Sequence, residues 1–404
     1  MVKTKYLILG AGPSGLTLGR SLKDKGITDF IILEKENEAG GLCRSMDVDG
    51  KPLDIGGGHF LDVRRPKVCE FMFRFLPENE WNVFDRDSRI RVHGCEIEHP
   101  FEANIWQLPE NIQEKYLDSI KKAGCNNGEP KPEKFTDWIR WKLGDEIAEN
   151  YMLPYNRKMF SETLDELGTY WLEKLPNVSF EETLQSCREH RSLGTQPGHA
   201  RFYYPKEYGY GEPFVRIAES MSENMVYAAV SKISLKNRIV TDINGEEYYA
   251  DKIITTIPWD AVTVVDTPEE ITNAISKLKH SSVEIRYVED SPESESHWIY
   301  VPDPDIPYHR ILCRCNFCLD SKGYWIETVK KRAESYRDSD ISENFAYMNE
   351  YAYPLNTIDK RENIATILKG ASEYGVIGLG RWGEHEHYNS DVVMERAMEL
   401  ADKL

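Results

Sequence analysis

Three glycines near the start of the chain, Gly10, Gly12 and Gly15, have the spacing that holds the phosphates of a dinucleotide. They directly follow an apolar run, Tyr6 to Leu9, and leucines at helical spacing come after them. In such a turn the first glycine lets the chain bend sharply, the second lets a pyrophosphate approach the backbone, and the third lets helix and strand pack closely. The free N–H groups and the positive end of the helix then bind the phosphates. We therefore expect a dinucleotide site at this turn.

The residues that follow make this prediction more specific. A second apolar run, Phe30 to Leu33, ends in Glu34, whose carboxylate can accept hydrogen bonds from a ribose diol and would repel a 2′-phosphate, so the site is not one for NADP. A glycine pair with an arginine comes next, ending in Gly41 and Arg44, and the guanidinium can contact the same pyrophosphate. The alternative is an ordinary βαβ unit that binds no ligand.

Composition limits the partners and the compartment. The 404 residues include 50 basic and 68 acidic side chains, and the net charge of −18 argues against nucleic acid or an anionic membrane as the main partner. No apolar run reaches the length of a membrane span. Eight cysteines and the lack of a signal peptide indicate reduced thiols in the cytoplasm. We expect a soluble, cytoplasmic protein that binds a phosphorylated ligand through locally placed Arg and Lys.

The elements that must position these residues can be followed along the chain. A hairpin with an Asp-Gly turn is predicted over residues 46–54, followed by three glycines, 56–58, and His59. The pattern is helical and rich in tryptophan from about residue 105 to 190. Strands return at 226–257 and again between 280 and 355, where one run covers 308–317. We expect something planar or bulky to lie against the three glycines, which carry no side chains.

The last segment is a strand that runs into a glycine turn and then a helix. Gly380 and Arg381 lie in the turn, and either Asn389 or Ser390 can cap the helix that follows. The helix would point its positive end at whatever lies in the turn. Cysteines at 313, 315 and 318 invite a metal interpretation, but on one strand they would alternate between faces, so we expect no metal site.

The glycine pair with Arg44 resembles that of the glutathione-reductase-like flavoproteins, in the amine-oxidase and sugar-mutase branch, which implies FAD. Further motifs, in the same order along the chain, resemble those of the UDP-galactopyranose mutases. These motifs are LDIGGGH at 53–59, HPFEANI at 99–105, PYNRK at 154–158, LDEL at 164–167 with Trp171, HWIYVP at 297–302, PYHR at 307–310, AYP at 352–354 and GRWG at 380–383.

The resemblance implies an α/β fold with a Rossmann-like FAD-binding domain, an inserted helical domain and a separate antiparallel sheet on the substrate side. The boundaries we expect are 1–90, 196–264 and 360–404 for the FAD-binding domain, 91–195 for the helical insertion and 265–359 for the sheet. Gly10, Gly12, Pro13, Ser14, Gly15, Glu34, Gly41, Leu42, Arg44, Gly57, Gly58, His59, Val230, Gly380, Arg381, Asn389 and Ser390 would bind the cofactor. Val230 would lie beside the adenine.

The resemblance also implies an isomerase of cell-surface polysaccharide biosynthesis. In that chemistry N5 of reduced FAD attacks the anomeric carbon of a UDP-hexopyranose, UDP leaves, and the sugar recloses through a different hydroxyl before UDP returns. Arg381, His59 and Arg310 would be catalytic. Phe101, Asn156, Lys174, Arg310, Tyr353, His387 and Asn389 would bind the nucleotide sugar.

Four residues depart from the family pattern, and all are on the substrate side. Lys174 replaces an arginine, His387 a tyrosine, Phe160 a tryptophan and Glu102 a glutamine. A mutase for a different sugar nucleotide, or a relative with a changed reaction, would show such departures.

Two alternatives stay open. One is an FAD-dependent oxidoreductase of the amine-oxidase or protoporphyrinogen-oxidase type, and the other is a flavin-binding protein without catalysis that acts as a scaffold. There is only one dinucleotide fingerprint, so NAD(P)H, if it reduces the flavin, must bind without a Rossmann domain of its own. A homo-oligomer is left open.

Overall fold

A dinucleotide-binding βαβ unit opens the chain in the computed structural model, which describes residues 1–160, 164–172, 177–194, 200–335 and 345–404. Strand β1 (Val2–Leu9) leads into helix α1 (Pro13–Asp24) and then strand β2 (Phe30–Glu34). The two strands are parallel, with Tyr6 opposite Phe30. The inner residues of β1 are buried on both faces, which is why this strand reads as a continuous apolar run. The predicted unit is confirmed.

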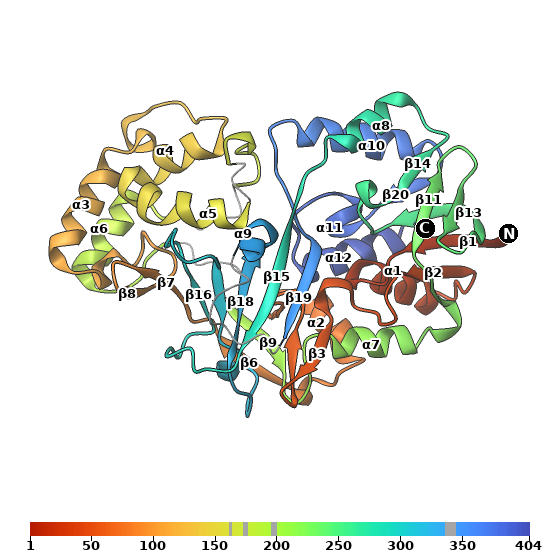
Figure 1. Cartoon of the computed structure of the whole chain (residues 1–404), viewed down its shortest axis with the longest axis horizontal. Coiled ribbons are helices and arrows are strands. Elements are labelled where there is room, and N and C mark those ends of the chain that lie inside the picture. The colour runs from red at the N-terminus through yellow and green to blue at the C-terminus, as the bar shows by residue number, and fades with distance from the viewer. Residues whose placement is uncertain (161–163, 173–176, 195–199, 336–344) are drawn as a thin grey trace.

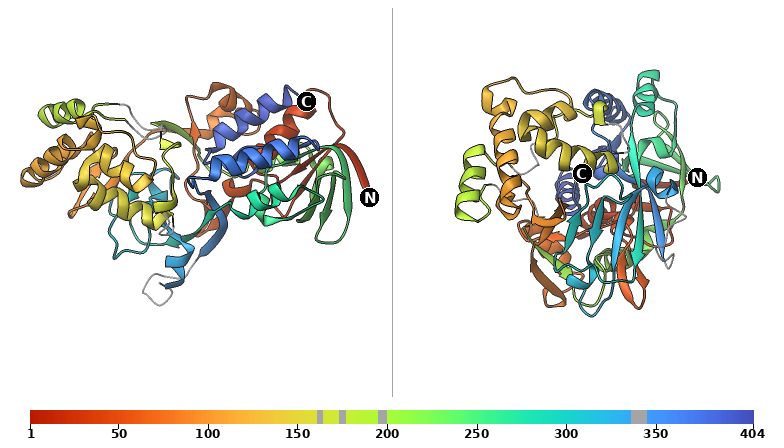
Figure 2. Two further views of the ribbon diagram at one scale, coloured as in Figure 1. Left: turned by 90° about the horizontal axis from the view of Figure 1, so that it is seen from above. Right: turned by 60° about the vertical axis from the view of Figure 1, so that its left-hand side comes forward.

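The first large sheet collects strands from three distant parts of the chain. Its order is β10 (Met225–Tyr227), β2, β1, β13 (Glu247–Thr255), β12 (Ile239–Asp242), β11 (Val230–Ser234) and β14 (Thr263–Val265), with β20 (Val376–Gly378) beside β13. Helices cover both faces (Figures 1 and 2). Ile8 belongs to the core shared with α1, α7 (Glu212–Glu219) and α12 (Ser390–Ala401), and Leu7 to the core shared with α8 (Glu269–Ser276) and α10 (Lys360–Ser372).

The second large sheet is antiparallel except at one pair of strands. Its order is β19 (Ala346–Pro354), β15 (His280–Val288), β18 (Tyr324–Val329), β17 (Arg310–Leu312), β16 (Trp298–Tyr300), β7 (Ser88–Val92) and β8 (Cys95–Glu98), and only β16 and β7 run parallel. The strand expected over 308–317 is shorter than predicted, because the chain turns into a 3-10 helix at Arg314–Asn316. Cys313, Cys315 and Cys318 therefore do not lie on one strand, and that expectation was wrong.

Smaller elements connect the two sheets. The predicted hairpin is β3 (Ser45–Val48) with β4 (Lys51–Asp54), and a three-stranded sheet contains β5 (Leu61–Asp62), β9 (Arg201–Pro205) and β6 (Trp81–Asp85). Helices α3 (Glu110–Lys121), α4 (Phe135–Ile147), α5 (Leu153–Met159) and α6 (Phe180–Glu189) lie together beside β7 and β8, at the left of Figure 1. The remaining helices are α2 (Pro66–Phe73), α9 (Lys330–Ser335) and α11 (Gly380–Gly383). The domain boundaries stay a prediction. Strand β7 crosses the boundary that was expected at residue 90.

Within the described ranges, no helix combines the length and the apolar character that crossing a membrane would need. All eight cysteines are free thiols, and four of them are at intermediate depth: Cys95, Cys125, Cys187 and Cys315.

Candidate functional site

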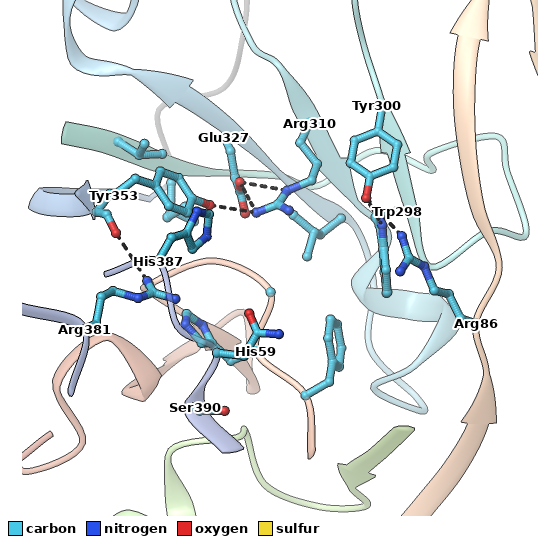
Figure 3. A pocket seen from close by; sticks show the side chains of 18 residues that line it. His59, Arg86, Trp298, Tyr300, Arg310, Glu327, Tyr353, Arg381, His387 and Ser390 are labelled. Carbon is cyan, nitrogen blue, oxygen red and sulfur yellow. Dashed lines mark hydrogen bonds and ion pairs between the residues drawn. The ribbon is translucent and has the colours of Figure 1, made fainter. Parts of the chain in front are cut away.

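A cavity of about 230 Å³ lies between the glycine bend at residues 56–58 and the second sheet. Figure 3 shows side chains from β17, β18, β19, α11 and the start of α12 converging on it. Most of the predicted catalytic and substrate-binding residues line this cavity: His59, Arg310, Tyr353, Arg381, His387 and Asn389. Gly58 and Ser390 from the predicted cofactor set line it as well.

Arg310 is held in the cavity wall by an ion pair. Its Nη2 and Nε donate to Glu327 Oε2 at 2.5 and 2.8 Å, and Nη2 also donates to the Tyr353 hydroxyl at 3.2 Å. Burial opposes the charge, but the Glu327 carboxylate raises the pKa of Arg310 well above its ordinary value. Burial also opposes the charge of Glu327 and by itself would raise the pKa of that carboxyl group. Arg310 and then His309 outweigh burial and lower the pKa of Glu327 to about 2. Both groups therefore stay charged at neutral pH.

Arg381 provides a second guanidinium on the opposite side of the cavity. It donates to two backbone carbonyls, that of Tyr388 at 2.8 and 3.0 Å and that of Ala352 at 3.2 Å. It donates to no carboxylate of the described residues. Burial lowers the pKa of Arg381, but a guanidinium stays protonated at neutral pH. A buried cation bound only by carbonyl dipoles favours an anion in front of it.

His59 follows the glycine bend and stays neutral. Its Nδ1–H donates to the Gly57 carbonyl oxygen at 3.0 Å, and its ring stacks against that of Tyr210. Burial, and after it the Arg381 guanidinium, lowers the pKa of His59 to about 4. The imidazole can therefore donate or accept a hydrogen bond in the cavity at neutral pH without carrying charge.

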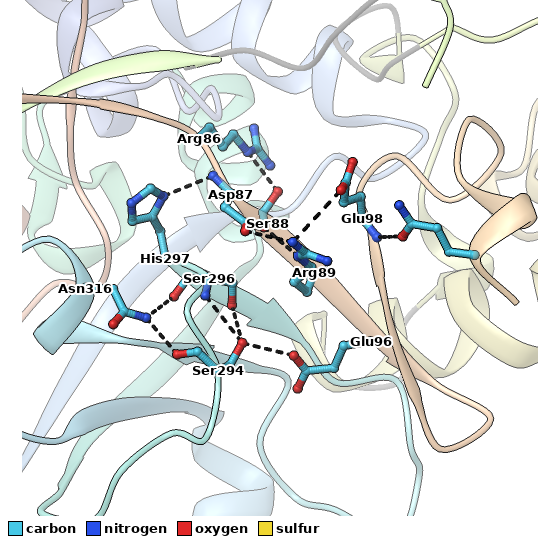
Figure 4. A network of polar contacts seen from close by, with 11 residues as sticks. Arg86, Asp87, Ser88, Arg89, Glu96, Glu98, Ser294, Ser296, His297 and Asn316 are labelled. Atoms are coloured by element: carbon cyan, nitrogen blue, oxygen red, sulfur yellow. Dashed lines mark hydrogen bonds and ion pairs between the residues drawn. The ribbon is translucent and has the colours of Figure 1, made fainter. Parts of the chain in front are cut away.

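A third guanidinium, that of Arg86, was missed by sequence reasoning. It stacks on Trp298 with its central carbon 4.6 Å from the ring, and it donates to Ser88 Oγ and to the Tyr300 hydroxyl, both at 3.0 Å. The neighbouring Asp87 is bound by Arg89 at 2.6 and 2.9 Å (Figure 4). Arg86 is brought to the cavity by the parallel pairing of β7 with β16, a long-range contact that the residues around it do not indicate.

Glu327 was also missed, although the sequence carries a signal for it. It is the only charged residue in β18, a strand of otherwise apolar and hydroxyl-bearing side chains, and it is 1% exposed. In the part of the chain that the structure describes, the charged side chains that line the cavity are three guanidiniums and one carboxylate. These four described side chains together carry a net charge of two positive, equal and opposite to that of a diphosphate esterified at both ends.

The first turn of α1 meets the requirements of a pyrophosphate site. Gly12 is its N-cap residue and no side chain caps the helix, so the first N–H groups are available. A Cβ at Gly15 would lie 2.0 Å from the Gly10 carbonyl oxygen, and one at Gly41 would lie 3.1 Å from the Gly12 Cα. The backbone of Gly40–Cys43, with Leu42 at its centre, thus closes over the turn. This cradle fits the diphosphate of FAD.

Glu34 and Arg44 lie near this turn but have protein partners. The Glu34 carboxylate accepts from the backbone N–H groups of Ala11 at 2.7 Å and Glu36 at 2.9 Å, one on each oxygen, which leaves each oxygen a further lone pair for a ribose hydroxyl. Arg44 donates to the Tyr347 hydroxyl at 2.7 Å and to the Gly41 carbonyl at 3.1 Å. The guanidinium of Arg44 thus joins the turn to the second sheet.

The three glycines of the bend are explained by the protein itself. A Cβ on Gly56 would lie 1.8 Å from the Leu42 carbonyl oxygen, one on Gly57 would lie 2.6 Å from Glu327 Oε1, and one on Gly58 would lie 2.2 Å from Leu312 Cδ2. A side chain at any of the three positions would therefore collide with the protein. Gly57 also has a φ of +92°. The bend therefore packs closely between the 41–43 segment and the second sheet.

The turn before α12 brings the C-terminal part of the chain to the first glycine turn. Gly380 has a φ of +77°, and a Cβ there would lie 2.0 Å from Ser14 Oγ. Asn389 is the N-cap residue of α12 but its side chain makes no capping bond, and the Ser390 hydroxyl bonds to Tyr210. The expected side-chain cap is therefore absent, and no capping side chain accepts a hydrogen bond from the first N–H groups of α12.

Other predicted residues lie away from the cavity. Phe101 is fully buried among Tyr116 and Tyr151, and Asn156 donates to the Met152 carbonyl at 2.7 Å. Val230, predicted beside the adenine, is half-buried at the start of β11. Lys174 lies outside the described residues.

The remaining departures from the mutase pattern are buried. Phe160 packs against Trp171, and burial raises the pKa of Glu102. Within the described ranges, no group of three or more His, Cys, Asp or Glu side chains could hold a metal ion.

The family model described as flavin containing amine oxidoreductase matches residues 13–289 of the chain. Among solved structures, that of a reduced UDP-galactopyranose mutase superposes with a TM-score of 0.87 at 23% identity, covering 100% of this chain and 94% of that one. A putrescine oxidase superposes with a TM-score of 0.64 at 13% identity, covering 100% and 99%. The fold is thus that of the flavin amine oxidases, with an inserted helical region and a second sheet as in the mutase.

Two curated relatives match shorter stretches. A protein of Methanothermococcus thermolithotrophicus, from the 3′ region of nifH2, is 44% identical over 52 residues, 13% of this chain and 49% of that protein. The dTDP-fucopyranose mutase of Escherichia coli is 21% identical over 184 residues, 43% of this chain and 46% of that enzyme. The chain spans less than half the length of the curated relatives it matches.

Proposed function

Because the chain belongs to the family of flavin-containing amine oxidoreductases, we propose that it is a flavin-dependent mutase that interconverts the pyranose and furanose forms of a nucleotide-linked hexose. The observation that carries the proposal is the positive cavity in front of the glycine bend. Arg310 and Arg381 lie on its two sides, and Glu327 is the one carboxylate that the described residues place in its wall. A diphosphate leaving group needs such a pair of cations, because its negative charge grows as the bond to the sugar breaks.

The cofactor would be FAD, bound with its diphosphate at the first turn of α1 and with the segment at 41–43 over it. When bound in reduced form, the flavin supplies a nucleophilic nitrogen for the anomeric carbon of the sugar. Arg310 keeps Nε and Nη2 hydrogens on Glu327, which holds the guanidinium in place, and its other N–H groups can donate to a phosphate oxygen. Arg381 is fixed by backbone carbonyls and so needs no rearrangement to stabilise charge.

Two further groups support a sugar between these cations. His59 is neutral and has its Nε2 free for a hydroxyl, since Nδ1 is bound to Gly57. Trp298 and Tyr300 form the wall next to Arg86, where the Trp298 Nε1–H donates to Tyr300 at 3.1 Å. Aromatic rings beside a guanidinium bind the apolar faces of sugars or a nucleobase. The substrate class would be a UDP- or dTDP-hexose, with the two mutases named above as the models for it.

The oxidation of an amine agrees less well with this cavity. An amine substrate is a cation at neutral pH, and three guanidiniums against one carboxylate would repel it. The charge of the wall therefore favours a nucleotide sugar over an amine as the ligand.

Binding tests the proposal directly. The flavin-loaded protein, oxidised and dithionite-reduced, is titrated with UDP, dTDP and uridine. We expect at least one of the two diphosphates to bind the reduced protein at least tenfold more tightly than uridine does, and the difference to shrink at high salt. If neither diphosphate binds in either redox state, or if uridine binds as tightly, the proposed function is wrong.

A further inference from the structure

Two hydrogen bonds between Asp87 and His297 close the end of the β7–β16 pair beside the cavity. The His297 backbone N–H donates to the Asp87 carbonyl oxygen at 2.8 Å, and the Asp87 backbone N–H donates to Nδ1 of the His297 ring at 3.0 Å (Figure 4). Regular strand pairing starts one residue later, where Ser88 lies opposite Trp298. We call these two bonds the clamp. One of them depends on a side chain, so a substitution can remove it.

The residues next to the clamp both line the cavity. Arg86 precedes Asp87, and Trp298 follows His297. Their side chains contact each other, with the guanidinium carbon of Arg86 4.6 Å from the Trp298 ring, and Arg86 also donates to the Tyr300 hydroxyl at 3.0 Å. A shift of the backbone at the clamp would therefore move two groups of the cavity wall at once.

The imidazole of His297 is buried among aromatic rings. It is 7% exposed, and its centroid lies 5.5, 5.2 and 6.5 Å from those of Phe84, Phe202 and Phe317. Because Nδ1 accepts the Asp87 N–H, the ring carries its proton on Nε2 and is neutral. A protonated ring would have N–H groups on both nitrogens and could not accept this bond.

The charges around the ring favour its neutral form. Burial has the largest effect and lowers the pKa of His297 below its ordinary 6.5; the Asp87 carboxylate opposes burial, and Arg86 acts with it. Arg89 of β7 binds the Asp87 carboxylate at 2.6 and 2.9 Å, and Arg314, on the nearby 3-10 helix, is bound by backbone carbonyls. Charged side chains on the other packed segments are exposed to solvent: Asp85 of β6, Arg201 of β9 and Glu295.

We propose that His297 is a positioning residue that, through the clamp, holds Arg86 and Trp298 where they contact a bound nucleotide sugar. It acts through the backbone of Asp87, because the ring itself lies behind the cavity wall. A buried N–H without an acceptor is unfavourable, so loss of the acceptor displaces this backbone. The inference rests on the proposed function and adds a requirement to it: the ligand binds well only while Nδ1 of His297 carries no proton.

The affinity for the ligand should then fall as the pH decreases. The clamp is closed in the form with a neutral imidazole, and the dissociation constant rises as the fraction of that form falls. This fraction decreases as the pH drops through the pKa of His297, which burial places under its ordinary 6.5. The guanidiniums and a diphosphate esterified at both ends keep their charges in this range, so they give no such dependence.

Two substitutions separate the acceptor from the bulk of the ring. His297→Asn places an amide oxygen the same number of bonds from the backbone as Nδ1, and this acceptor does not take up a proton. His297→Leu keeps an apolar side chain of similar size and removes the acceptor. His93→Asn is the matched control, because His93 is exposed in the turn after β7 and is not among the described residues that line the cavity.

Affinity and ring protonation are measured separately. Dissociation constants of UDP-galactose and dTDP-fucose are determined for the photoreduced flavoprotein from pH 5.0 to 8.0, since dithionite decomposes in acid. Nitrogen NMR of histidine-labelled protein, with the His297 signal assigned by its loss in H297N, reports the protonation of the ring without any ligand. We expect Nδ1 of His297 to be unprotonated at pH 7.

At pH 8 we expect H297L to bind about tenfold more weakly than wild type, and H297N and H93N to bind like wild type. Toward pH 5 the dissociation constant of wild type should rise about threefold relative to that of H297N, a ratio that cancels the other groups that titrate. Wild-type affinity in H297L, a ratio of wild type to H297N that is constant with pH, or a proton on Nδ1 at pH 7 would overturn the inference and leave the proposed function intact. If neither nucleotide sugar binds any of these proteins, the inference and the proposed function both fail.

Discussion

Glu327 binds Arg310 with one carboxylate oxygen and lies against Gly57 with the other. Oε2 accepts both bonds from Arg310, and Oε1, which makes no hydrogen bond, lies 2.6 Å from where a Cβ on Gly57 would be. Arg310, the proposed diphosphate ligand, and the glycine bend are therefore positioned by the same side chain. A change at either residue should affect the other.

Gly57→Ala should disturb the site through both sterics and backbone strain. The new methyl group would meet Glu327, and a φ of +92° is unfavourable for alanine by roughly 1 kcal/mol or more. We expect loss of most bound flavin, measured as the ratio of absorbance at 450 nm to that at 280 nm. Gly245→Ala is the control, since its φ of +84° is similar but nothing lies within 4 Å of its Cβ. Equal flavin content in the two variants would contradict this account.

Glu327→Gln should lower stability at neutral pH and change its acid dependence. Burial raises the pKa of Glu327, but Arg310 and His309 lower it further, to about 2 from an ordinary 4.5. A carboxyl group whose pKa is lowered by folding stabilises the fold at pH values above its pKa in the unfolded chain. This contribution is lost as the pH falls from about 4.5 toward 2. The contribution is on the order of 3 kcal/mol.

Urea denaturation of the flavin-loaded protein measures this prediction at pH 7 and pH 4. We expect E327Q to be less stable than wild type by roughly that amount at pH 7, with a smaller difference at pH 4. Glu350→Gln removes an exposed pair with Lys330 and should cost less than about 1 kcal/mol. A neutral effect of E327Q at pH 7 would show that the buried pair is not needed for the fold.

Arg310→Lys and Arg381→Lys should weaken binding of a nucleoside diphosphate while preserving the charge. Lysine is a point charge without the planar fork, so each variant should bind UDP or dTDP about 10- to 100-fold less tightly. Arg216→Lys, a surface arginine paired with Glu212 at 2.8 Å, should leave the affinity unchanged. Unchanged affinity in both cavity variants would mean that the diphosphate binds elsewhere.

Lys158→Met should remove a contribution to stability that grows as the pH rises. Lys158 is fully buried, donates to the carbonyls of Val301 at 2.8 Å and Tyr308 at 3.2 Å, and so fixes the segment that leads to Arg310. Burial, and then Arg332, lowers its pKa to about 7 from 10.5. Between these values the unfolded chain binds the proton and the folded one does not, so stability rises with pH.

Melting temperatures from pH 7 to 10 test the role of Lys158. We expect the melting temperature of wild type minus that of K158M to increase from pH 7 to 10, and Lys206→Met, an exposed control, to follow wild type. The same pH trend in K158M as in wild type would contradict the assignment.

The dinucleotide unit could be predicted from local patterns in the sequence, and family motifs led to His59, Arg310 and Arg381 of the cavity. The spacing of Gly10, Gly12 and Gly15 and the turn around Arg381 each report a backbone conformation that neighbouring residues determine. Arg86 could not be found, since only the pairing of β7 with β16 brings it beside Trp298. The assignment of Phe101 to the substrate came from a motif, and the structure has its ring in the core of the helical region.

Conversion of a nucleotide sugar by the reduced protein is the most direct test of the central claim. Dithionite-reduced and oxidised flavoprotein are each incubated with UDP-galactopyranose or dTDP-fucopyranose, and the products are separated by chromatography. We predict a new isomer of unchanged mass, the furanose form, from at least one substrate with the reduced protein only. No isomer from either substrate, or equal conversion by the oxidised protein, would contradict the account.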